Sequence, residues 1–309
     1  MAHSLLRRGS GQGWPLRPPK SDTLLAEPAP VFGAERAAAP AAVIAEGFTA
    51  LVLAGSRPGG DPLAHAAGVS HKALAPLAGV AMLTRVVATL RAAQAVRRIV
   101  ICGIDRQVLA REPQLHSFLD TGHLGLVSSR ATPSASVFSA MEQLAPCTPL
   151  LVATADHPLL TAALVDDFCA RSARSGADVT VGLVPARLVR GAFPGVRRTT
   201  LPFRDGPYCG CNLFAFLTPQ AQRAPAAWIQ VERHRKQPWR MVSALGVGMT
   251  LRFLLRRLTV DAVTDLASDR IGVRIRPIVL SQPEAGFDVD TSAQLAVAEA
   301  FLRKRERTA

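Results

Sequence analysis

The sequence predicts an α/β protein in which a mainly parallel sheet lies between two layers of helices. Short apolar runs alternate along the chain with longer segments whose apolar residues recur every three or four positions. Such a strand, helix, strand rhythm places successive strands in parallel, with helices on both faces of the sheet. The 309 residues, of which 49% are hydrophobic and 19% charged, are enough for a sizeable buried core.

The alternation begins at residues 51–53, an apolar run typical of a buried parallel strand. A helix is expected over residues 83–90, because Leu83, Val86 and Leu90 would share one helical face. Strands at residues 99–102, 124–128, 150–154 and 179–184 and helices at about 134–144 and 162–175 are expected next. Beyond Pro185 the rhythm weakens, and strands are expected only at residues 211–217 and 271–280.

The first 47 residues differ from the rest, since they are rich in proline, alanine and arginine and show no sustained period. They are predicted to form a flexible extension. Residues 48–302 are predicted to form one domain with two halves, 48–184 and 185–302, followed by a basic tail at 303–309. Ligands of an open parallel sheet bind beyond the C-terminal ends of its strands, so the site is expected at that edge.

The chain is strongly basic, with a formal charge of +13 and a pI near 10.9. This favours anionic partners such as nucleotides and phosphorylated metabolites. Aromatic residues make up only 5% of the chain, so the stacking surface of a single-strand nucleic-acid binder is not expected. Residues 249–258 have a basic amphipathic pattern that suits an anionic membrane surface, although such helices more often pack on their own core.

A cytoplasmic location is expected from the cysteines and the apolar segments. The five cysteines are odd in number and mostly lie in or beside apolar runs, as reduced thiols do. No run approaches the roughly 20 apolar residues that span a bilayer. The N-terminal residues also lack the continuous apolar core of a secretory signal. The oligomeric state is left open.

An apolar strand, a loop rich in glycine and proline, and a lysine follow one another between Leu51 and Gly79. Glycines such as Gly55 and Gly59 allow backbone conformations that bring N–H groups close to an anion. Lys72 would then supply a positive charge. The order of these features predicts a phosphate-binding loop.

This stretch, LVLAGSRPGGDPLAHAAGVSHKALAPLAG, resembles the signature of MobA-like nucleotidyltransferases, the molybdopterin guanylyl/cytidylyltransferase-like superfamily. Ser56 replaces the family's second glycine, and His71 replaces the usual proline before the lysine. The resemblance covers roughly residues 48–302 and implies a Rossmann-like fold of the nucleotide-diphospho-sugar transferase, or GT-A-like, kind. Three further segments fit in order, PSASVFSAMEQL at 133–144, ATADHPLLT at 153–161 and FDVDTSAQLAVAEAF at 287–301.

The resemblance assigns the triphosphate to the loop after the first strand, at Ala54, Gly55, Ser56 and Arg57, and the phosphates also to Lys72. Arg57 and Lys72 would thereby be catalytic, since nucleotidyl transfer needs cations to offset charge in the transition state. The alternative for Lys72 is a solvated loop lysine.

The second segment implies a turn of small residues against the nucleoside. Ser134 and Ser136 would leave room for the base and ribose. Serine is also common at the start of a helix, so both interpretations of these residues stand.

A magnesium ion is expected to bind after the strand at residues 150–154. Asp156 follows that strand directly, and Mg²⁺ prefers a few hard oxygen ligands together with substrate phosphates. Asp288 and Asp290 alternate, so in an extended segment both could approach one cation. As alternatives, Asp156 caps a nearby helix, and Asp290 with Thr291 caps the last one.

The acceptor is expected in the second half, where basic residues cluster. Arginine forks hold phosphate and carboxylate groups well. The candidates are Arg198, Arg235 and Lys236. Asn212 is a further candidate contact of the acceptor or of the metal, with a simple turn residue as the alternative. A charged run is also commonly just a solvated face.

Together these features predict a magnesium-dependent nucleotidyltransferase that moves NMP from an NTP, with CTP or GTP favoured, to a phosphorylated small molecule and releases pyrophosphate. One alternative is a non-catalytic nucleotide-binding or sensing protein on the same fold, motivated by Ser56 and His71. Another is a GT-A-type glycosyltransferase, suggested by the D-x-D pattern of Asp288 and Asp290. That pattern stands at the end of the domain, whereas in those enzymes it occupies the place that Asp156 holds here.

Overall fold

A computed structural model describes residues 47–56, 59–120, 124–144, 149–233 and 258–307. All of them belong to the unit Ala38–Ala309. The expected N-terminal extension and most of the amphipathic segment at 249–258 lie outside the described residues. No helix in the described ranges is long and apolar enough to cross a membrane.

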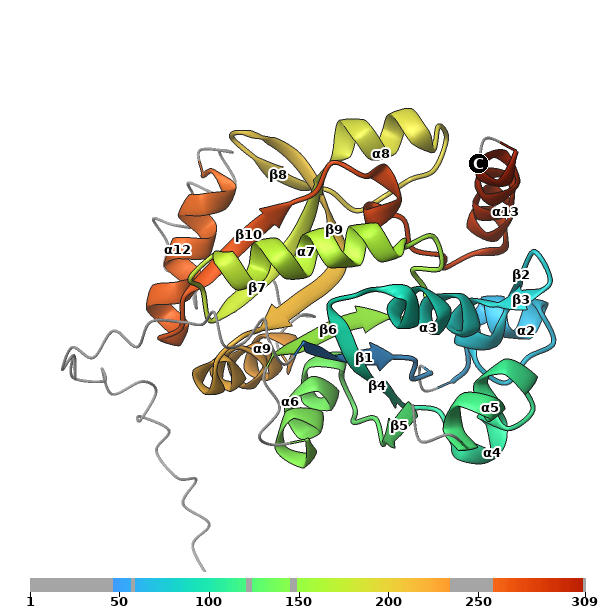
Figure 1. Ribbon diagram of the computed structural model, residues 1–309. Helices are drawn as coiled ribbons and strands as arrows, with labels where there is room; N and C mark the ends of the chain where they lie inside the picture. The colour runs from blue at the N-terminus through green and yellow to red at the C-terminus, as the bar shows by residue number, and fades with distance from the viewer. Residues whose placement is uncertain (1–46, 57–58, 121–123, 145–148, 234–257, 308–309) are drawn as a thin grey trace, which may run out of the picture. The chain divides into compact units, whose positions relative to one another are not determined.

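The central sheet has the strand order β10-β7-β9-β6-β1-β4-β5, with β8 paired to β9 (Figure 1). β1 pairs in parallel with β4 and β6, β4 with β5, and β10 with β7, whereas β9 runs antiparallel to β6 and β7. The strands are β1 Phe48–Leu53, β4 Val96–Cys102, β5 Leu124–Val127, β6 Leu150–Thr154, β7 Val179–Pro185, β8 Leu201–Phe203, β9 Gly206–Phe216 and β10 Ile275–Val279, and β2 Pro76–Leu77 forms a separate hairpin with β3 Val80–Ala81.

Helices cover both faces of this sheet. β1 illustrates this arrangement, because alternate residues of a strand point to opposite faces of the sheet and both faces of β1 are buried. Ala50 and Val52 belong to one buried cluster, and Leu51, between them, belongs to a second. The first cluster includes residues of α3 and α7, and the second includes residues of α6. The helices are α2 Pro62–Ala66, α3 Met82–Ala92, α4 Arg106–Leu109, α5 Pro113–Asp120, α6 Pro133–Gln143, α7 Ala162–Arg174, α8 Ala186–Ala192, α9 Arg223–Arg233, α12 Val260–Ile271 and α13 Ser292–Glu306, with 3-10 turns η1 Lys72–Leu74, η2 Pro219–Gln222 and η3 Pro283–Gly286.

The predicted α/β class with a mainly parallel sheet between helical layers is confirmed. The strand expected at 271–280 is wrong at its start, because Ile271 ends α12 and Gly272 adopts the left-handed conformation that caps it. The strand expected at 211–217 begins earlier, at Gly206. The boundary expected at residue 302 falls inside α13, which continues to Glu306.

Two contacts bring distant parts of the chain to the C-terminal end of β6. The Ala155 amide donates to the Leu53 carbonyl, so the hydrogen bonding between β1 and β6 continues just past the end of β6. The Val289 amide donates to the Asp156 carbonyl over 2.9 Å, so the segment before α13 lies against the end of β6. The candidate site is built where these segments meet.

Candidate functional site

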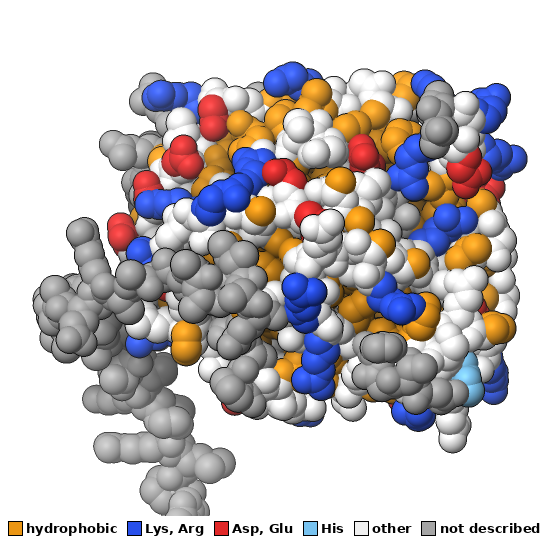
Figure 2. All heavy atoms as spheres, in the orientation of Figure 1, with side chains coloured by type: hydrophobic (Ala, Val, Ile, Leu, Met, Phe, Trp, Pro, Cys, Tyr) orange, Lys and Arg blue, Asp and Glu red, His pale blue; other side chains and the backbone are white. Residues whose placement is uncertain are grey.

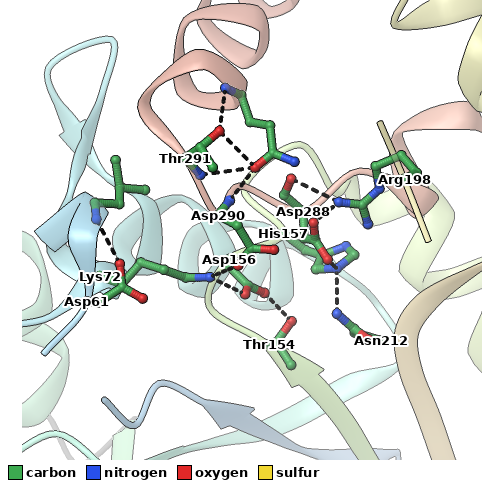
Figure 3. A network of polar contacts seen from close by, with 12 residues as sticks. Asp61, Lys72, Thr154, Asp156, His157, Arg198, Asn212, Asp288, Asp290 and Thr291 are labelled. Atoms are coloured by element: carbon green, nitrogen blue, oxygen red, sulfur yellow. Dashed lines mark hydrogen bonds and ion pairs between the residues drawn. The ribbon is translucent and has the colours of Figure 1, made fainter. Parts of the chain in front are cut away.

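Lys72 lies between two carboxylates that come from distant parts of the chain (Figure 3). Its ammonium nitrogen is 2.7 Å from Asp156 Oδ2 and 2.5 Å from Asp290 Oδ1. Lys72 begins η1, Asp156 follows β6, and Asp290 precedes α13. The structure therefore brings together three of the residues that the sequence singled out.

The charges in this group reinforce one another. Burial alone would lower the pKa of Lys72, but the charges and hydrogen bonds of Asp156 and Asp290 outweigh it and hold that pKa above its usual value of 10.5. Burial would raise the pKa of Asp156, but His157 when charged and Lys72 lower it overall. The Thr154 hydroxyl also donates to Asp156 Oδ1 over 2.6 Å. Both side chains are thus held in their charged forms near neutral pH.

Asp156 and Asp290 fit a magnesium ion better than Asp288 does. The first two carboxylates converge on one cation, Lys72, and both supply the hard oxygens that Mg²⁺ prefers. Across the described ranges no group of three or more acidic, histidine or cysteine side chains could hold a metal alone. A pair of carboxylates suits Mg²⁺ that also binds substrate phosphates and water. The expectation that Asp288 shares this cation with Asp290 is not supported by their contacts.

Asp288 instead pairs with Arg198, the residue expected to bind the acceptor. Arg198 Nη1 forms an ion pair with the Asp288 carboxylate and lies 3.3 Å from the carbonyl oxygen of the same residue. Only 12% of the Arg198 side chain and 16% of the Asp288 side chain are exposed. Arg198 therefore contacts the chain segment that carries Asp290.

His157 lies behind this pair in the interior (Figure 3). Its Nε2 is 3.0 Å from Asn212 Nδ2 and 4.0 Å from Asp288 Oδ2. Burial lowers the pKa of His157 to about 4 against the opposing charge of Asp156, so the ring is neutral near pH 7. Asn212, expected to contact the acceptor, hydrogen-bonds this buried ring.

Asn212 has an unusual backbone conformation. Its φ angle is 48°, a left-handed value that costs a non-glycine residue about 1 kcal/mol or more. The register between β7 and β9 shifts opposite this part of β9, between Val181 and Leu183. The strained residue thus sits at a bulge that directs its amide toward His157.

The loop after β1 begins at the end of a strand that pairs in parallel with β6, the strand that Asp156 follows. Ala54 is buried, whereas Gly55 and Ser56 are exposed at the end of the strand. A methyl group on Gly103 would lie 2.7 Å from Gly55 Cα and 3.0 Å from Ser129 Cβ, so the ends of β1, β4 and β5 meet closely here. Such a compact backbone surface is suited to a phosphate or a ribose.

The serines at the start of α6 are partly committed to local structure. The Ser136 hydroxyl accepts from the Arg130 amide over 2.8 Å and donates to the Thr132 carbonyl. Thr132, not Ser134, caps α6. Ser136 therefore fixes the turn between β5 and α6, where the nucleoside was expected.

The capping alternatives for the aspartates are resolved by the neighbouring threonines. Thr161 caps α7, so Asp156 is not its cap. Thr291 caps α13 in a capping box with Gln294, which leaves the Asp290 carboxylate to Lys72. Arg57, Arg235 and Lys236 lie outside the described residues.

Sequence reasoning gave no role to His157, Thr154 or Gly103. His157 follows Asp156 directly in an apolar segment, which was an available signal. Thr154 and Gly103 carried no comparable signal, because their contacts come from the spatial arrangement of strand ends.

The chain belongs to the family of the MobA-like NTP transferase domain, whose model matches residues 50–245. A hypothetical transferase from Thermus thermophilus is 28% identical, with a TM-score of 0.67, and the match covers 81% of this chain and 99% of that one.

More distant structures share the fold. A 4-diphosphocytidyl-2C-methyl-D-erythritol synthase from Anaerococcus prevotii has 13% identity and a TM-score of 0.51 over 85% of this chain and 99% of its own. A second 4-diphosphocytidyl-2C-methyl-D-erythritol synthase has 14% identity and a TM-score of 0.52, over 83% and 98%. No curated protein matches the chain.

Proposed function

We propose that this protein is a magnesium-dependent nucleotidyltransferase that transfers NMP from an NTP to a phosphorylated small molecule and releases pyrophosphate. The observation that carries the proposal is the position of Lys72 between Asp156 and Asp290. One cation and two carboxylates, at the C-terminal edge of a parallel sheet, are the groups needed to hold a triphosphate with a divalent ion. The family membership supports the same reaction class.

The reaction would use few protein groups. A phosphate oxygen of the acceptor attacks the α-phosphorus of the NTP, a new P–O bond forms, and the bond to the β-phosphate oxygen breaks to release pyrophosphate. A phosphate acceptor is already anionic near neutral pH, so no general base is required. Lys72 would turn from the carboxylates to the triphosphate and offset its charge.

Asp156 and Asp290 are the residues that would hold the magnesium ion. The ion would polarise a phosphoryl oxygen and so stabilise the charge that develops in the transition state. Once Lys72 turns to the phosphates, both carboxylates are free to bind a divalent cation. The loop at Gly55 and Ser56 would orient the triphosphate with its backbone N–H groups.

CTP and GTP are the nucleotides we favour. The two synthases similar in fold are named for a diphosphocytidyl group, which supports testing CTP first. A phosphorylated small molecule is the acceptor class that the chemistry above requires. The charge of +13 suits a protein whose substrates are all anions.

The test is pyrophosphate release by the purified protein with each of the four NTPs, magnesium and a pool of phosphorylated metabolites. We expect release with one NTP, and a loss of roughly a hundredfold or more in rate for both Lys72→Ala and Asp156→Ala, as for other groups that stabilise developing charge. Arg276→Ala, at an exposed ion pair on β10, is the control and should keep wild-type activity. Intact NTP binding without release would instead favour a nucleotide-sensing protein.

A further inference from the structure

We infer that Arg198 is a positioning residue that, through its ion pair with Asp288, holds the Asp290 carboxylate opposite Asp156. This inference rests on the proposed function, because it concerns how the cation-binding pair is assembled. It replaces the expectation that Arg198 binds the acceptor.

The segment that carries Asp290 is extended, and its apolar side chains anchor it in the core. Phe287 and Val289 have no exposed surface. Since successive side chains of an extended segment point to opposite sides, Asp288 and Asp290 face away from this core. The Val289 amide donates to the Asp156 carbonyl, so the two acidic segments share a backbone hydrogen bond. A shift of this segment would move Asp290 relative to Asp156.

Arg198 contacts both the side chain and the backbone of one residue in this segment, Asp288. It pairs with the Asp288 carboxylate and approaches the Asp288 carbonyl at 3.3 Å, two residues before Asp290. Arg198 itself comes from the segment between α8 and β8, which is 90 residues away along the chain. The Arg198 side chain is mostly buried, and its ion pair and its hydrogen bond are both made with Asp288, so the two contacts tie Arg198 to the side chain and the backbone of that one residue.

His157 and Asn212 lie beside Asp288 on its interior side. His157 Nε2 lies 4.0 Å from Asp288 Oδ2, and Asn212 holds the same ring nitrogen from its strained position on β9. Figure 3 shows Arg198, Asp288, His157 and Asn212 as one connected group beside the Lys72 group. Asp288 is thus held by Arg198, while Asp290 faces Lys72.

Because Arg198 already pairs with Asp288, its guanidinium is poorly placed to bind an acceptor. The Arg198 side chain is only 12% exposed, and its charge is already paired with Asp288. An acceptor phosphate would have to displace that carboxylate. The effect of Arg198 should therefore appear in the affinity of the cation site and not in acceptor binding.

The experiment is a titration with Mn²⁺, observed by electron paramagnetic resonance, of protein saturated with α,β-methylene-CTP or, in a parallel series, α,β-methylene-GTP. The variants are Arg198→Ala, Arg198→Lys, Asp288→Asn and the charge swap Arg198→Asp with Asp288→Arg. We expect Arg198→Ala and Asp288→Asn to weaken Mn²⁺ binding roughly tenfold to a hundredfold, the usual effect of removing an outer-shell partner. Arg198→Lys and the charge swap should recover part of the loss.

The control is Arg276→Ala, which breaks an exposed arginine–aspartate pair elsewhere and should leave Mn²⁺ affinity unchanged. Circular dichroism identifies any variant that does not fold, and Asp288→Asn, which preserves side-chain shape, then decides the question. Wild-type Mn²⁺ affinity in folded Arg198→Ala and Asp288→Asn, or a raised acceptor KM as the sole effect, would overturn the inference. Failure of the wild-type protein to bind Mn²⁺ with either analogue would instead count against the proposed function and, with it, this inference.

Discussion

The charge state of each ionised side chain in the site depends on its neighbours. Lys72 keeps its positive charge because Asp156 and Asp290 face it, and Asp156 keeps its negative charge because Lys72 and Thr154 face it. His157 is the exception, since burial keeps its ring neutral beside these charges. Its neutrality has a measurable consequence for stability.

The unfolding free energy should fall between pH 6.5 and about 4. The folded-state pKa of His157, about 4, lies below the ordinary value of 6.5, so the unfolded chain binds the proton more readily in this window. Stability is therefore full above pH 6.5 and is lost as the pH falls, by up to about 3 kcal/mol, at 1.36 kcal/mol for each unit of pKa shift. Asp156, whose pKa lies below its usual 3.8, adds its own loss only at lower pH.

Urea unfolding at pH 7, 6, 5 and 4 with a chelator present measures this slope. His157→Gln should have a flatter profile than wild type, whereas His65→Gln, at an exposed position on α2, should not. Equal slopes in His157→Gln and wild type would show that His157 is not the group that titrates.

At the scale of elements, the ends of the neighbouring strands β1 and β4 approach each other closely. Gly103 follows β4 with a φ of 95°, and a methyl group there would meet the backbone of Gly55. Gly176, after α7, also has a left-handed φ of 65°, but no atoms lie within 4 Å of a methyl group there. The two positions share backbone strain and differ in crowding.

Gly103→Ala should weaken NTP binding, whereas Gly176→Ala should not. Both substitutions place alanine at a positive φ, which should cost about 1 to 2 kcal/mol of unfolding free energy. Gly103→Ala should cost more than this, because its methyl group would also lie 2.7 Å from Gly55 Cα. Only Gly103→Ala pushes the backbone of the loop that is proposed to hold the triphosphate. Calorimetric titration with the active NTP tests this, and equal NTP affinities in the two variants would show that the end of β4 does not shape the nucleotide site.

The elements themselves could largely be predicted from the sequence. Apolar runs marked β1, β4, β6 and β7, because buried parallel strands have few alternatives to such runs. The antiparallel direction of β9 could not be predicted, since periodicity carries no direction. The residues before β10 were misassigned because Ile271 and Val273 continue an apolar run across the cap at Gly272.

The site was predictable only in part for a similar reason. Lys72, Asp156 and Asp290 occupy recognisable local motifs, so their sequence contexts pointed to them. The Arg198–Asp288 pair joins residues 90 positions apart and has no local pattern. The roles expected for Arg198 and Asn212 therefore assumed open contacts that the structure assigns to Asp288 and His157.

At the scale of the whole molecule, positive charge is widely spread. Figure 2 shows lysine and arginine side chains distributed over one face, with fewer acidic ones between them. The site group is different, because Asp156, Asp288 and Asp290 outnumber Lys72 and Arg198. A basic surface can attract anionic substrates, while a locally acidic group can retain a divalent cation.

The most direct measurement of the central claim is the fate of each phosphate of the NTP. The protein is incubated with magnesium, phosphorylated metabolites and NTP labelled with ³²P at either the α or the γ position. The account predicts that α label enters the acceptor product and γ label appears in pyrophosphate, with both lost in Asp156→Ala. Transfer of the γ label to the acceptor, or no transfer of α label while the NTP remains bound, would contradict it.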